Sequence, residues 1–116
     1  MAIERHETGP RMSRVVVHNG TVYLAGFTAD DPNLPIQGQT RQVLHKIDRY
    51  LAMACTDKSQ LLTAQIWLAD IAMWADMNTV WDAWVVAGHT PARATVQAKL
   101  AGPAHLIEIM VVAAAK

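Results

Sequence analysis

The sequence predicts a single α+β domain, spanning residues 1–116, in which two helices cover one face of a mixed β-sheet. The chain has 116 residues, of which 52% are hydrophobic, so one core can form without disulfides or metals. Segments 37–54 and 72–87 repeat apolar residues at helical spacing, and short β-branched or alternating runs lie around them. Two helices cannot cover both faces of such a sheet, so we expect packing between subunits to cover the other face.

The N-terminal part predicts a β-hairpin followed by a loop. Segments 15–18 and 22–26 are β-branched or aromatic runs, and Asn19-Gly20 between them accepts the positive φ angles of a tight turn. Segment 30–35 contains two prolines, each lacking the N–H donor that a strand would need. This segment is therefore expected to be a loop.

The first helix is predicted over 37–54, and a strand over 61–68 follows it. The apolar residues of the helix recur at spacings of one, three and four, which places them on one stripe. Lys58-Ser59 interrupts the pattern before the strand, and Asp70 ends the strand and can cap the next helix. The stripe consists of Val43, Leu44, Ile47, Leu51 and Ala54.

The second helix is predicted over 72–87, with Gly88 as a C-cap and Pro91 as a stop. Strands over 92–100 and 106–113 complete the sheet. Because the apolar residues of this helix have helical spacing and no interleaved basic residues, they predict core packing, not a platform for stacking bases. They are Trp74, Met77, Trp81, Trp84 and Val85.

Charge and composition narrow the classes of function. Ten basic residues balance ten acidic ones without any run of three basic residues, which argues against a nucleic-acid partner. Cys55 is the only cysteine, and the five histidines form no metal-ligand pair, so neither a disulfide nor a metal site is expected. No signal peptide or membrane-spanning run is visible, so we expect a cytoplasmic protein with no membrane partner. Charged residues make up only 17%, which favours self-association.

Arg93 is a candidate receptor for an acidic substrate. It follows Pro91 at the start of a predicted strand, a position where functional side chains are common. Its guanidinium can offer two parallel N–H donors to the two oxygens of a carboxylate. A structural ion pair with an acidic residue of the chain is the alternative.

Glu108 is the one charged residue of the apolar run 106–112. Burial of a carboxylate without partners costs on the order of several kcal/mol, so a cation is expected nearby, and Arg93 is the candidate. A partly desolvated carboxylate can also position water or transfer a proton near neutral pH. The alternative is a core or interface carboxylate that is simply paired with a basic group.

These residues belong to a longer pattern by which the chain resembles the RidA/YjgF family of small imine and enamine deaminases, over nearly its full length. The YoaB/RutC-like branch of that family is the most similar. The pattern comprises segment 19–26, Gln39, segment 67–70, Met77-Asn78, segment 81–89, segment 91–98 and Ile107-Glu108-Ile109.

The resemblance implies a chorismate-mutase-like fold assembled as a homotrimer with clefts between subunits. It also implies hydrolysis of 2-imino acids to 2-oxo acids and ammonia without a metal or an organic cofactor. In that scheme Arg93 holds the substrate carboxylate, backbone groups at Thr95 hold the imine nitrogen, and Glu108 positions the attacking water. Positioning and one acid–base group suffice, because an activated C=N bond is readily hydrolysed.

Three substrate-binding positions depart from the family pattern. Met12, or Arg11 in a shifted alignment, stands where the family has an aromatic wall, and Arg11 would make the pocket more cationic. Phe27, after Ala25-Gly26, replaces a polar residue. A non-catalytic or regulatory protein that binds a small carboxylate in the same cleft is therefore the alternative function, and an RNA-acting or chaperone-like protein is a third that the net charge disfavours.

Overall fold

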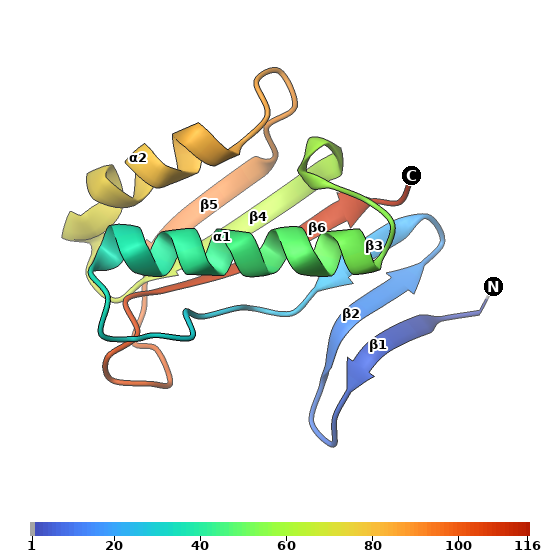
Figure 1. The fold of residues 1–116 in the computed structure, drawn as a ribbon, viewed down its shortest axis with the longest axis horizontal. Coiled ribbons are helices and arrows are strands. Elements are labelled where there is room, and N and C mark those ends of the chain that lie inside the picture. The colour runs from blue at the N-terminus through green and yellow to red at the C-terminus, as the bar shows by residue number, and fades with distance from the viewer. Residues whose placement is uncertain (1) are drawn as a thin grey trace.

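A computed structural model describes residues 2–116 and contains one six-stranded sheet with two α-helices packed on it (Figure 1). The predicted α+β architecture is confirmed. In chain order the elements are β1 Glu4–Thr8, β2 Ser13–His18, β3 Thr21–Leu24, α1 Ile36–Met53, the 3₁₀ turn η1 Lys58–Gln60, β4 Leu61–Leu68, the 3₁₀ turn η2 Ile71–Met73, α2 Trp74–Trp84, β5 Ala92–Gln97 and β6 Ile107–Ala114.

The sheet has the order β1-β2-β3-β6-β4-β5, so β1 and β5 form its two edges. All neighbouring strands are antiparallel except β4 and β5, which are parallel because α2 connects them as a crossover. The turn between β2 and β3 has φ angles of 50° at Asn19 and 75° at Gly20, as the hairpin prediction required. Both helices lie on the same side of the sheet (Figure 1).

Strand β1 was not predicted from the sequence. Four of its five residues are exposed and all five are polar or charged, so it has no alternating apolar pattern. Its backbone pairs with β2, which makes it an edge strand, and charged side chains on such an edge oppose further strand pairing.

The second helix ends earlier than predicted. Its last residue is Trp84, because Val85 has an extended backbone with ψ of 154°. Gly88 has a positive φ of 78° but lies in the following loop, so it is not the C-cap. Asp70 accepts a hydrogen bond from the backbone of Ala72 and caps η2, the turn that leads into α2. The expected core stripe is only partly buried, since Trp74 is 49% exposed.

The helices cover one face of the sheet and leave the other face exposed. Residues Ile107 and Ile109 of β6 are fully buried under the helices, whereas the alternate residues of that strand project from the other face. On that second face, Tyr23 is 46% exposed and Val96 is 50% exposed. Within residues 2–116, one largely apolar sheet face thus lacks a covering layer. No helix in residues 2–116 is both long and apolar enough to span a bilayer.

Gln39 ties α1 to the two loops at its N-terminal end. Its side chain is fully buried, and Nε2 donates to three backbone carbonyl groups. Its Oε1 accepts a hydrogen bond of 2.9 Å from the backbone N–H of Leu106, the residue before β6. The three carbonyls belong to Pro32, Leu34 and Ala104.

Replacing Gln39 by alanine removes a hydrogen-bond partner from four backbone groups, three of which belong to half-buried residues. We expect Gln39→Ala to lower the free energy of unfolding by about 3 kcal/mol or more, measured by urea denaturation at one protein concentration. Gln37→Ala is the matched control, because Gln37 makes a single side-chain hydrogen bond to the carbonyl of Asp76. A loss of about 0.5 kcal/mol is expected there, and equal losses in the two variants would contradict the role of Gln39.

Candidate functional site

Arg93 lies on the edge strand β5 and points to the helix side of the sheet. Its register partner on β4 is Ala64, which is 1% exposed on that side. The Arg93 Nη1 group donates a hydrogen bond of 2.8 Å to Oδ1 of Asn78, and the guanidinium lies 5.2 Å from the ring centroid of Trp81. Asn78 and Trp81, which are three residues apart on the same side of α2, therefore hold the guanidinium in place.

The guanidinium borders a surface cavity of about 490 Å³ between α2 and β5. Burial lowers the pKa of Arg93 from its ordinary value, and the nearby carboxylate of Asp82 opposes this shift. The group stays positively charged at neutral pH, since arginine begins from a very high pKa. The cavity is lined by Trp74, Ala75, Asn78, Trp81, Asp82 and Arg93.

Thr95 lies two residues beyond Arg93 and on the same side of β5. Its register partner is Ile66, another buried residue of the helix-covered face. The Thr95 Oγ1 atom is buried and has no hydrogen-bond partner within residues 2–116. An unpaired buried hydroxyl is costly, so a group that approaches β5 and bonds to it would gain stability.

Glu108 projects from the uncovered face of β6, opposite Trp67 of β4. It borders a small hollow of about 230 Å³ that Lys99 and Leu100 also line. Gly26 makes room for this side chain, because a Cβ atom at position 26 would overlap Oε2 of Glu108. The glycine after β3 thus allows the carboxylate to lie against the backbone.

Arg93 and Glu108 do not meet within one chain. Strand β4 separates their strands, and alternation places them on opposite faces of the sheet. The expected ion pair between them is wrong for a single chain: none of the ion pairs in residues 2–116 includes either residue. The residues around Glu108 are apolar on both sides of the strand, so the sequence did not predict whether Glu108 and Arg93 would project from the same face of the sheet.

The three substrate-binding positions that depart from the family pattern are dispersed. Arg11 and Met12 are exposed in the turn between β1 and β2, at the opposite edge of the sheet from Arg93. Phe27 is 1% exposed, and its ring stacks on Tyr50 with centroids 4.8 Å apart. The expectation that the Phe27 side chain lines the cleft is therefore wrong, because it fills the core instead.

Five residues of α2 line the Arg93 cavity, and none of them was identified as a site residue from its chemistry. Trp74 and Trp81 were interpreted as core, and Asn78 and Asp82 had no evident role. Their spacing contains a signal, because positions 74, 78, 81 and 82 share one side of a helix that can face an edge strand. Only the packing of α2 beside β5 shows that this side borders Arg93.

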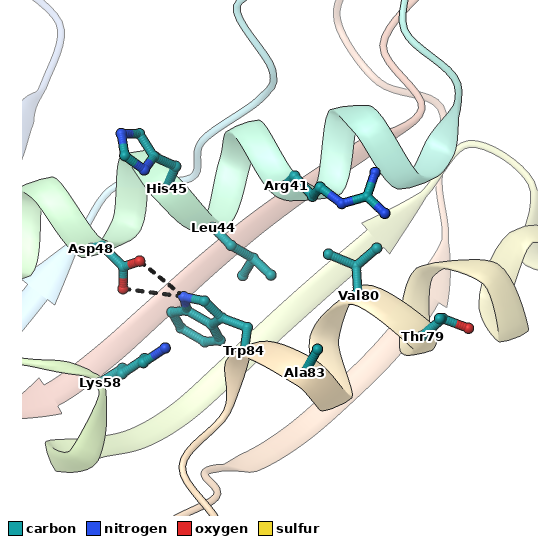
Figure 2. Close-up of a pocket in the computed structure, with 9 residues that line it drawn as sticks. All are labelled: Arg41, Leu44, His45, Asp48, Lys58, Thr79, Val80, Ala83 and Trp84. Carbon is teal, nitrogen blue, oxygen red and sulfur yellow. Dashed lines mark hydrogen bonds between the residues drawn. The ribbon is translucent and has the colours of Figure 1, made fainter.

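A second hollow, of about 480 Å³, lies between α1 and α2 (Figure 2). The Nε1 group of Trp84 donates to both carboxylate oxygens of Asp48 at 3.1 Å, and Nζ of Lys58 lies 5.2 Å from the Trp84 ring centroid. These polar groups bond to each other and join the two helices. We assign this hollow a structural role, and no group of three metal-ligating residues occurs in residues 2–116.

The fold and the cavity define a small α+β protein that presents a fixed arginine beside the edge of its sheet. Comparison with known proteins agrees with this class. A family model described as Endoribonuclease L-PSP matches residues 4–115, and the chain belongs to this family, the RidA/YjgF family, with the RutC-like proteins as relatives.

Individual relatives are similar over nearly their whole length. The RutC family protein YoaB of Escherichia coli is 46% identical over 116 residues, covering 98% of this chain and 99% of that protein. A RutC family protein of Haemophilus ducreyi is 42% identical over 112 residues, covering 97% and 96%. The crystal structure of a YjgF family member from Neisseria meningitidis is 44% identical, with a TM-score of 0.97 and coverage of 100% and 97%.

The contact between Gly26 and Glu108 can be tested by adding one methyl group. We expect Gly26→Ala to displace the Glu108 carboxylate, visible in a crystal structure, and to lower the free energy of unfolding by about 1–2 kcal/mol. Gly9→Ala is the control, because a Cβ atom there makes only an ordinary contact of 3.6 Å with the Met12 carbonyl oxygen. If the Glu108 carboxylate keeps its position in the Gly26→Ala structure, the prediction is wrong and the space beside residue 26 is larger than the contact implies.

Proposed function

We propose that the protein is a hydrolytic deaminase of reactive 2-imino and enamine acids. The reaction converts the iminium form and water into a 2-oxo acid and an ammonium ion. The water oxygen bonds to the C=N carbon, and the π electrons of that bond move to nitrogen. Proton transfer to nitrogen then lets ammonia leave as the C=O bond forms. No metal or organic cofactor takes part in this scheme, and we propose a cytoplasmic location.

The observation that carries this proposal is the setting of Arg93. The guanidinium has five N–H donors and makes one side-chain hydrogen bond, to Asn78, among the described residues. It is held against Trp81 at the border of a cavity, so little conformational entropy is lost when a carboxylate binds. An arginine arranged in this way suits a small acid as the ligand.

Glu108 would act from a neighbouring chain. Because Arg93 and Glu108 of one chain lie on opposite faces of the sheet, one ligand can reach both only where two chains meet. The uncovered apolar face supports such a meeting, and we propose a homotrimer with clefts between subunits. In a cleft, Thr95 would lie beside Arg93, and the exposed turn with Arg11 and Met12 would approach from another chain.

Glu108 would take a proton from the attacking water and return it to the nitrogen. A carboxylate beside a half-buried Trp67 and next to the Gly26 backbone has limited access to water, which favours such proton transfer. Positioning and acid–base help are each worth about 10²–10⁴-fold or more in rate.

Two other functions compete with this one. A non-catalytic protein that binds a small carboxylate would use the same Arg93 cavity, and it would bind 2-oxo acids without accelerating hydrolysis. The family description names an endoribonuclease, but the chain has ten basic and ten acidic residues, which disfavours RNA as a ligand.

Turnover can be measured by generating imino acids with an amino-acid oxidase and following the release of 2-oxo acid. We expect the wild-type protein to accelerate release and Arg93→Ala to reduce the rate to that of buffer, because the carboxylate clamp is lost. Arg41→Ala, which removes an exposed arginine on α1, should retain the wild-type rate. Calorimetry showing tight 2-oxo acid binding by a wild-type protein that does not accelerate release would instead support the non-catalytic function.

Mixing two inactive variants tests whether the site is shared between chains. Arg93→Ala and Glu108→Gln chains that are unfolded and refolded together should recover about one quarter of the wild-type rate, since about one cleft in four then combines an intact Arg93 with an intact Glu108. The same variants refolded separately and then combined serve as the control. A site contained within one chain would give no recovery in either case.

A further inference from the structure

The Arg93 cavity contains a second charge that the proposed reaction does not use. Asp82 lies four residues after Asn78 on α2, so both residues occupy the side of the helix that faces Arg93. Asp82 lines the same cavity as Arg93, yet no ion pair within 4.0 Å joins them in the described chain. A cation and an anion therefore border one hollow without bonding to each other.

The charges of a ligand decide whether Arg93 and Asp82 attract it or repel it. A 2-oxo acid carries only a carboxylate, which Arg93 attracts and Asp82 repels. An iminium acid carries a carboxylate and, on the adjacent carbon, a positively charged nitrogen. Such a ligand can direct its carboxylate to Arg93 and its nitrogen to Asp82, so both charges of the cavity favour binding.

We propose that Asp82 is a specificity-determining residue, which makes the Arg93 cavity select acids that carry a cationic nitrogen beside the carboxylate over 2-oxo acids. This inference rests on the proposed function, because it names the protonated iminium as the form of the substrate that binds. Protonation also makes the C=N carbon a better electrophile for water. After hydrolysis the nitrogen leaves as ammonium, and the remaining 2-oxo acid is repelled by Asp82, which favours its release.

The side chain of the ligand would be apolar. Trp74 is 49% exposed and forms one wall of the cavity, and Ala75 lies beside it on α2. A volume of about 490 Å³ accommodates a branched aliphatic side chain together with the charged groups. Leucine and 4-methyl-2-oxopentanoate are therefore suitable probes, because they share one carbon skeleton and differ in the nitrogen or oxygen at the second carbon.

The test compares the affinities of the two probes for wild-type protein and Asp82→Asn, measured by calorimetry at low salt. We expect Asp82→Asn to weaken leucine binding by about twofold to fivefold and to tighten 4-methyl-2-oxopentanoate binding by a similar factor. Asp76→Asn is the matched control: it removes an exposed carboxylate of the same helix outside the cavity and should change neither affinity.

Opposite shifts for the two probes would support the inference, since a structural disturbance would move both affinities in one direction. Shifts in the same direction, no shift, or no binding of either probe to the wild-type protein would overturn it. A failure of the proposed function can be distinguished from a failure of this inference. If imine hydrolysis is not accelerated while the two probes still shift in opposite directions, the cavity selects cationic nitrogen without catalysing the reaction.

Discussion

The strict alternation of side chains along β5 and β6 is the constraint on which the proposed site depends. On β6, buried Ile107 and Ile109 direct Glu108 to the uncovered face, because neighbouring residues of a strand point in opposite directions. On β5, the register with Ala64 directs Arg93 to the helix-covered face. A shift of one residue in β6 would move the Glu108 carboxylate into the core, and a shift of one residue in β5 would take Arg93 away from Asn78 and Trp81 of α2. Two chains are then needed to bring the pair to one ligand.

Besides covering the core, both helices help to position the residues of the proposed site. Helix α2 supplies Asn78 and Trp81, which hold the Arg93 guanidinium, and it also presents the carboxylate of Asp82. Helix α1 acts indirectly through Gln39, whose oxygen accepts a hydrogen bond from the backbone of Leu106, just before β6. Each helix therefore positions a different part of the proposed cleft: α2 the part that receives the acid, and α1 the strand that carries Glu108.

Strong local patterns allowed much of the fold to be predicted. The turn at Asn19-Gly20 and both helices were expected and are present, because backbone preference and apolar spacing agree there. Strand β1 escaped prediction, since its residues are polar and only pairing with β2 makes them a strand. Phe27 was expected in the cleft because of its place in the chain, but its ring stacks on Tyr50 in the core.

The sequence by itself determined the α+β class, the two helices, the uncovered sheet face and the identity of Arg93 and Glu108 as residues of interest. These conclusions depend on local spacing and on residue chemistry. Only the tertiary structure decided that the two charges lie on opposite faces and that Asp82 shares the cavity of Arg93. Strand order, register and the packing of α2 beside β5 bring together residues that are distant in the chain, and no local pattern specifies those contacts.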